Sequence, residues 1–154
     1  MTSPDLKKPK LPDTKSCVCL TVRKAARAVT QHYCVFMTQT GLKESQFSIL
    51  AVLAQTGPLI MGALAEILVM DRTTLTRTLR PLKNHKLVDI VPGKDSRTRE
   101  IHITKTGQTK LNNALPHWHA AQQSLLDQYG DQEWQSLKAQ IDQLTTTSRS
   151  KPSP

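Results

Sequence analysis

The sequence predicts a mainly α-helical chain with one small β-hairpin. Apolar residues recur every three or four positions in several separate segments, which is the period of a helix with one buried face. Between residues 87 and 104 the apolar residues partly alternate instead, as in two short strands, and the turn-forming segment Gly93–Ser96 divides them. A length of 154 residues is enough for one domain with a core.

The charge of the chain predicts a polyanionic partner. The net charge is +9, and residues 71–105 supply +5 of it, with 9 bases and 4 acids. The first 16 residues have no apolar run, and no stretch approaches about 18 consecutive apolar residues, so neither a signal peptide nor a membrane span is expected. The 3 cysteines have no disulfide-framework spacing, and a cytoplasmic location is the simplest expectation.

The N-terminal half is expected to hold a tail and three helices. Residues 1–15 lack periodicity and predict a disordered tail. A long helix is predicted over residues 16–38, and Gly41 ends the pattern. A second helix is predicted over residues 44–55 and ends at Gly57-Pro58. A very short strand is predicted at residues 59–60, and a third helix over residues 61–69.

The helix that begins at Arg72 is the most informative. Asp71 suits its N-cap, and Leu75, Leu79 and Leu82 form one apolar stripe. The opposite side is rich in Thr and Arg, and from residue 72 to 88 there is no acid; its candidate DNA-contact residues are Arg72, Thr73, Arg77, Arg80 and Lys83. Arg donates twice to guanine, and the other cations neutralise phosphates. The alternative is a surface helix with a solvated basic face. Pro81 is expected to bend its second half.

The neighbouring segments favour DNA binding. The helix over residues 61–69 and the basic helix, joined by a brief turn, have the helix-turn-helix pattern. The hairpin that follows carries Lys94, Arg97 and Arg99 at its loop, which suits a wing that enters the minor groove. Residues 41–104 are therefore the expected winged helix-turn-helix DNA-binding lobe.

The terminal helices predict a homodimer. A helix over residues 104–129, with a kink at Pro116, and another over residues 131–145 precede an expected disordered tail, residues 146–154. Residues 16–40 and 105–145 carry more apolar surface than one small lobe can cover, so they are the expected dimerisation helices. A dimer places two recognition helices about 34 Å apart, which predicts a pseudo-palindromic site in double-stranded DNA.

These features together resemble the MarR family of bacterial winged-helix regulators. The segments that carry the resemblance are residues 41–47, 64–66, 71–77, 82–88, 95–97 and 103–107. The resemblance implies a homodimeric transcription regulator, most often a repressor released by a ligand or by thiol oxidation. It also implies base or phosphate contact at Arg72, Thr73, Thr74, Thr76 and Arg77, and minor-groove contact at Arg97, which Asp95 helps to orient.

Three positions depart from the family pattern. Lys43 and Ile60 stand where relatives usually have a capping Ser or Thr, so two helix starts are expected to be weaker by about 1 kcal/mol each. Lys86 stands where relatives usually have Gly before the wing strand, and it is expected to bear strain if φ is positive there.

The cysteines suggest a redox signal. Cys19 and Tyr33 have the spacing found in family members that sense organic hydroperoxides, but about 21 Å of helix separates them, so they can meet only across a dimer. Glu44 stands in place of a second tyrosine and would raise the thiol pKa. Alternatively, Cys19 is a small hydrophobe at the dimer interface. Cys17 and Cys19 face different sides of the helix, which disfavours a disulfide between them. Cys34 is a candidate resolving thiol. A soft metal or metalloid held by Cys17, Cys19 and Cys34 across the dimer is a further alternative.

The sequence therefore predicts a sequence-specific DNA-binding regulator, a repressor released by oxidation at Cys19 or by a small-molecule inducer. No phosphate loop, nucleophile elbow or metalloprotease motif is present, so neither catalysis nor a cofactor is expected. Two alternatives stay open. One is a dimeric ligand- or metal(loid)-binding protein with only non-specific DNA affinity, and the other is a scaffold that acts through protein contacts.

Overall fold

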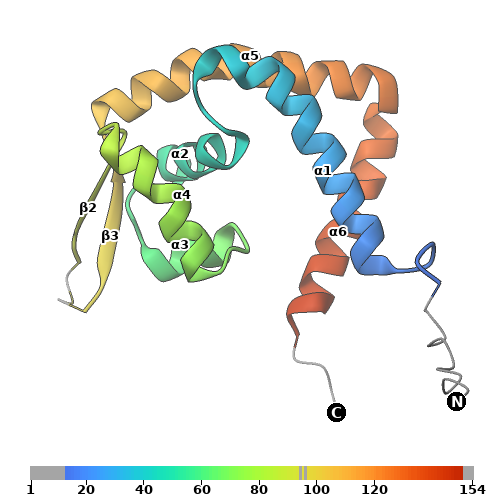
Figure 1. Cartoon of the computed structure of the whole chain (residues 1–154), viewed down its shortest axis with the longest axis horizontal. Coiled ribbons are helices and arrows are strands. Elements are labelled where there is room, and N and C mark those ends of the chain that lie inside the picture. Colours follow the sequence, from blue (N-terminus) through green and yellow to red (C-terminus); the bar gives the residue numbers. More distant parts are fainter. Residues whose placement is uncertain (1–12, 94, 96, 151–154) are drawn as a thin grey trace, which may run out of the picture.

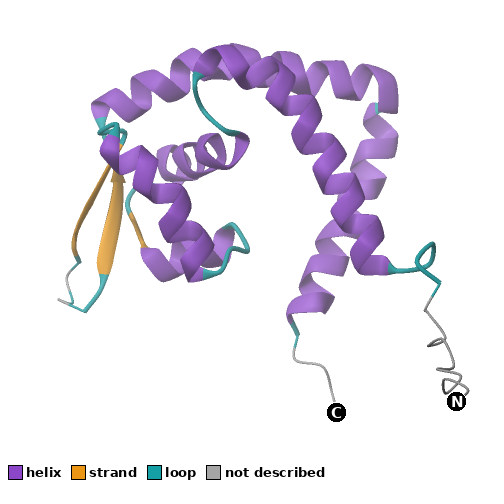
Figure 2. Cartoon of the chain, in the orientation of Figure 1, coloured by secondary structure: helices purple, strands orange, loops and turns teal. Residues whose placement is uncertain are grey.

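The computed structural model describes residues 13–93, 95 and 97–150, and it is mainly helical with a small sheet (Figures 1 and 2). The predicted fold class is confirmed. The elements in chain order are α1 (Val18–Met37), the short 3-10 helix η1 (Thr38–Thr40), α2 (Glu44–Thr56), β1 (Leu59–Ile60), α3 (Met61–Ile67), α4 (Arg72–Asn84), β2 (Val88–Pro92), β3 (Arg99–Ile103), α5 (Lys105–Tyr129) and α6 (Asp131–Arg149).

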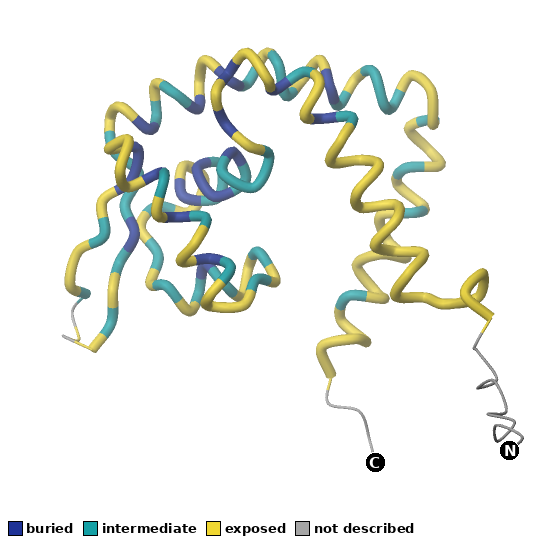
Figure 3. Tube along the Cα trace, in the orientation of Figure 1, coloured by how far each residue is buried: buried dark blue, intermediate teal, exposed yellow. Residues whose placement is uncertain are grey.

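The helices and strands form a compact lobe and an extended arm (Figure 1). The lobe contains α2, α3, α4 and the strands, and the arm contains α6 and most of α1. Helix α5 continues through Pro116 and arches over both parts. Figure 3 shows buried residues gathered in the lobe and beneath α5, whereas the arm is mostly exposed. The core therefore holds the lobe together, whereas the apolar side chains of the arm remain exposed.

The three strands form one antiparallel sheet in the order β1-β3-β2. Ile101 of β3 lies opposite Ile90 of β2 on one side and opposite Leu59 of β1 on the other. Ile101 is fully buried, so this central strand ties the hairpin to the core. The two-residue strand that the sequence predicts at Leu59–Ile60 is confirmed.

Helix α4 packs through the stripe that the sequence predicts. Leu75, Leu79 and Leu82 are each at most 1% exposed. Burying a leucine side chain stabilises a fold by roughly 1.5–3 kcal/mol, so three of them hold this helix firmly against the core. Its opposite face is consequently fixed in direction and turned to solvent.

The expected lack of a capping side chain at two helix starts and the positive φ of Lys86 are confirmed. Neither Lys43 nor Ile60 supplies a side-chain cap, although the Gln46 side chain accepts the backbone N–H of Lys43 at 2.9 Å. Lys86 has φ of 56°, a left-handed conformation that favours glycine. Val69, between α3 and α4, also has positive φ, 51°, which the sequence did not reveal.

Two predicted boundaries were wrong. Helix α6 continues to Arg149, so residues 146–149 are helical and not a disordered tail. The hydroxyl of Thr146 bonds the carbonyl of Asp142 one turn back, which satisfies a polar group that would otherwise favour a non-helical backbone. Helix α3 ends at Ile67, before Val69. The tail was predicted over residues 1–15, of which residues 1–12 lie outside the described residues. Residues 151–154 and the wing residues Lys94 and Ser96 also lie outside them.

Candidate nucleic-acid interface

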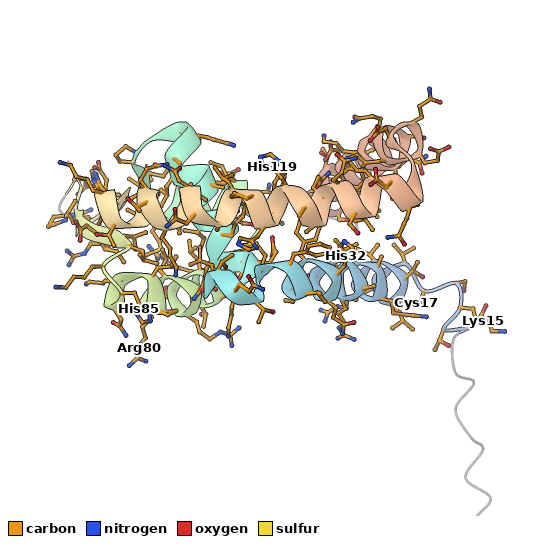
Figure 4. The ribbon with its side chains drawn as sticks, turned by 90° about the horizontal axis from the view of Figure 1, so that it is seen from above. Lys15, Cys17, His32, Arg80, His85 and His119 are labelled. Carbon is orange, nitrogen blue, oxygen red and sulfur yellow. The ribbon has the colours of Figure 1, made fainter. Side chains whose placement is uncertain are left out.

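The exposed face of α4 presents arginines and threonines together. Five of them line one shallow, open hollow of about 450 Å³: Arg72, Thr73, Thr76, Arg77 and Arg80. Arg80 points outward from the outer edge of the lobe in Figure 4. Lys83 is exposed one turn further along the helix. Side chains of these types can donate to base edges and to phosphate oxygens.

Thr74 has a different place from its neighbours. Its backbone N–H and its hydroxyl both donate to the Asp71 carboxylate, at 2.8 Å and 2.6 Å. These bonds, the hydroxyl first, hold the pKa of Asp71 below its ordinary value of 3.8. Thr74 therefore serves the N-cap of α4. Its hydroxyl proton is committed, as is that of Thr76, which donates to the carbonyl of Arg72 at 2.8 Å. An Asp followed three residues later by Thr was the available sequence signal.

The wing turn is organised by Asp95. Its carboxylate accepts the backbone N–H of Arg97 at 2.9 Å, and its carbonyl accepts both the N–H and the hydroxyl of Thr98. Arg97 and Arg99 are exposed at this end of the hairpin. Asp95 thus shapes the backbone that carries Arg97, and its contact is with the backbone rather than with the guanidinium.

The cations of this interface are available for a ligand. Among the described residues, no acid forms an ion pair with an arginine of α4 or of the wing. The ion pairs of the described residues are formed by other side chains, and they are His102–Glu100, Lys138–Asp142 and Arg149–Glu66. Unpaired arginines keep their full charge for a polyanion such as a phosphate backbone. The structure therefore brings together the predicted residues of α4 on one face and those of the wing on the adjacent hairpin.

The three cysteines are free and exposed. Cys34 follows Tyr33 directly in the sequence, whereas Cys17 and Cys19 lie at the opposite end of α1 from Tyr33. Cys17 stands just before the outer end of α1 (Figure 4), and Cys19 lies within its first turn. Tyr33 is buried at the other end of α1, where its hydroxyl donates to the side chain of Gln122 in α5. Burial, and next the charge of Glu44, raises the pKa of Tyr33. Within one chain, Tyr33 therefore joins α1 to α5 and lies at the far end of α1 from the thiol of Cys19.

Two further site classes find no support in the described part of the chain. No cluster of three or more His, Cys, Asp or Glu side chains has an arrangement suited to a metal ion within residues 13–93, 95 and 97–150. Likewise, none of the helices described is both long and apolar enough to cross a membrane.

Known proteins resemble this chain in sequence and in structure. A profile described as MarR family matches residues 40–97. The transcriptional regulator MosR of M. tuberculosis, solved in complex with DNA, is 34% identical, with a TM-score of 0.76 over 86% of this chain and 98% of that one. A second MosR structure gives 32% identity and a TM-score of 0.77 over 88% and 98%. An uncharacterised HTH-type regulator of Bacillus subtilis is 24% identical over 112 residues, which are 73% of this chain and 82% of that protein.

The family profile spans the helix-turn-helix and the start of the wing, and the similarity to MosR covers a larger part of the chain, 86%. Members of this family are transcriptional regulators, not enzymes. The chain belongs to the MarR family of transcriptional regulators, with the DNA-binding fold of that family.

Proposed function

We propose that this protein is a homodimeric repressor that reads a pseudo-palindromic site in double-stranded DNA. The observation that carries the proposal is the exposed Arg/Thr face of α4, which is free of ion pairs among the described residues and is held by a buried leucine stripe. That a 34% identical regulator was solved with DNA supports it.

Within this proposal, α4 enters the major groove and the wing approaches the adjacent minor groove. Arg77 lies in the middle of the exposed face and reads base edges, whereas Arg80 and Lys83, near Pro81, contact phosphates. Arg97 enters the minor groove, where narrow A·T tracts concentrate negative potential.

The arm supplies the dimer interface. Helices α1 and α6 leave large apolar side chains exposed, among them Val18 at 61%, Val29 at 44% and Ile141 at 43%. An apolar face of this extent on two neighbouring helices is costly in water, and a second copy related by a two-fold axis covers both faces at once.

Gel-shift titration of DNA fragments, beginning with the DNA upstream of the protein's own gene, tests this function. Arg77→Ala should weaken selective binding by about 5- to 150-fold, the loss expected for one bidentate base contact. Lys43→Ala removes one exposed positive charge at the start of α2, outside α4, the wing and the arm helices, and should leave binding nearly unchanged. Arg97→Ala should weaken binding to A·T-rich flanks, and unchanged affinity there would contradict the role given to the wing.

The release signal is either oxidation of Cys19 or a small-molecule inducer. Either one weakens DNA binding by favouring a lobe spacing that does not fit the operator. The exposed thiol of Cys19 supports the first of these. Titrations with thiol reductant and with an organic hydroperoxide, on wild type and Cys19→Ser, separate the two: loss on oxidation in wild type alone supports the thiol signal, and indifference to oxidant favours an inducer.

The outcome that would overturn operator recognition is binding that follows salt concentration but not sequence. Such a result would favour a ligand-binding protein with only non-specific DNA affinity. Absence of any DNA affinity at moderate salt would favour a scaffold.

A further inference from the structure

The C-terminal end of the arm touches the helix-turn-helix. Arg149, the last residue of α6, places Nη2 3.5 Å from Oε1 of Glu66 and Nη1 3.5 Å from the backbone oxygen of Glu66. The two residues are 83 positions apart in the sequence. In Figure 1, α6 descends from the far end of α5 and its last turn leans back toward the lobe. We call this pair of contacts the Arg149–Glu66 clasp.

The clasp reaches the turn that joins α3 to α4. The backbone oxygen of Glu66 also accepts the N–H groups of Leu68 and Val69, the latter at 3.2 Å. It belongs to the C-terminal end of α3, where unsatisfied carbonyls carry partial negative charge and a cation is stabilising. Val69 holds φ of 51°, an unusual conformation for a β-branched residue, so the bonds around this carbonyl maintain a strained turn.

We propose that Arg149 is a positioning residue for DNA binding, and that the Arg149–Glu66 clasp fixes the helix-turn-helix turn to the arm. This inference rests on the proposed DNA-binding function. The larger contacts between the lobe and the arm in the described part of the chain lie where α1 and α2 pack on α5 and on each other. A second attachment at the α3–α4 turn restrains rotation of the lobe about α5, and therefore restrains the spacing of the two α4 helices in a dimer.

The expected effects are small because both partners are exposed, Arg149 at 47% and Glu66 at 73% of the side chain. Exposed ion pairs of this kind change an equilibrium by about two- to five-fold. Arg149→Ala should therefore speed hydrogen exchange at the Leu68–Met70 amides by about two- to five-fold. It should weaken by a similar factor the binding of a duplex that the wild-type protein selects from a random-sequence library.

The test combines these two readouts on five variants of the full chain. Arg149→Ala, Glu66→Ala and the double variant form a mutant cycle, and the charge exchange Glu66→Arg with Arg149→Glu restores the attraction between the side chains. Lys138→Ala is the matched control, because it removes the same charge from α6 but breaks only the Lys138–Asp142 pair within that helix. It should leave exchange at the α3–α4 turn unchanged.

The clasp predicts that hydrogen exchange at the turn is about as fast in the double variant as in the faster single variant, and that high salt reduces the difference from wild type. The variant with reversed charges should recover part of the slow hydrogen exchange, because it restores the side-chain attraction but not the donation to the Glu66 carbonyl. The clasp is refuted if Arg149→Ala has the hydrogen-exchange rate of wild type at the turn. It is also refuted if the effects of the two single variants simply add and the variant with reversed charges recovers none of the slow hydrogen exchange. If the hydrogen-exchange results are as expected but the wild-type protein selects no duplex, the Arg149–Glu66 contact exists. In that case both the positioning role of Arg149 and the proposed DNA-binding function are wrong. Selective binding that Arg149→Ala leaves intact overturns the positioning role alone.

Discussion

Replacing Gly107 with alanine is expected to destabilise the protein. Gly107 is the third residue of α5 and is buried against the junction between α4 and the wing. A Cβ atom there would lie 2.0 Å from the backbone oxygen of Leu87 and 3.0 Å from Cγ1 of Ile103. The Leu87 oxygen accepts the N–H of Thr104 at 3.1 Å, so it is not free to move away. The start of α5 must shift, and the wing strand with it.

The magnitude follows from two opposing effects. Overpacking a close contact costs about 1–3 kcal/mol, and a clash with backbone belongs at the upper end of that range. Alanine regains about 1 kcal/mol over glycine within a helix. The net loss is therefore about 2 kcal/mol. In a protein of this size 1 kcal/mol corresponds to about 2–4 °C, so the Tm should fall by about 4–8 °C.

Gly62→Ala is the matched control. Gly62 is the second residue of α3, and nothing lies within 4 Å of a Cβ added there, so this substitution should raise stability by about 0.5–1 kcal/mol. Both variants are measured by thermal unfolding, followed by circular dichroism, at one protein concentration, because the Tm of a dimer depends on concentration. A Tm for Gly107→Ala at or above that of wild type would refute the steric reasoning.

Two other predictions concern the backbone and the cap. Lys86→Gly should raise the free energy of unfolding by about 0.5–1 kcal/mol, because φ of 56° costs a residue with a Cβ but not glycine; a urea midpoint that stays constant or falls would contradict this. The folded pKa of Asp71 lies below 3.8, so the stabilisation by its charged form is complete above that pH and is lost as pH falls through the lower folded value. Thr74→Val, which removes the hydroxyl, should move the Asp71 pKa back toward 3.8 in an NMR titration, and an unmoved pKa would show that the hydroxyl has no such effect.

The sequence by itself determined the features that depend on local pattern. The leucine stripe of α4, the hairpin and the two-residue strand before α3 all follow from periodicity and turn chemistry within about a dozen residues. The strain at Lys86 could be expected because relatives usually have Gly at that position, and φ of 56° meets the condition on which the expectation depended. The family resemblance could be stated from short segments, because each segment depends on a local feature such as a turn, a helix cap or an apolar period.

Only the tertiary structure decided which polar side chains bond residues that are far away in the sequence. Tyr33 bonds a residue 89 positions away, and Arg149 one 83 positions away. Contacts at that separation depend on how α5 and α6 turn the chain back toward the lobe, and no periodicity within one helix specifies that direction.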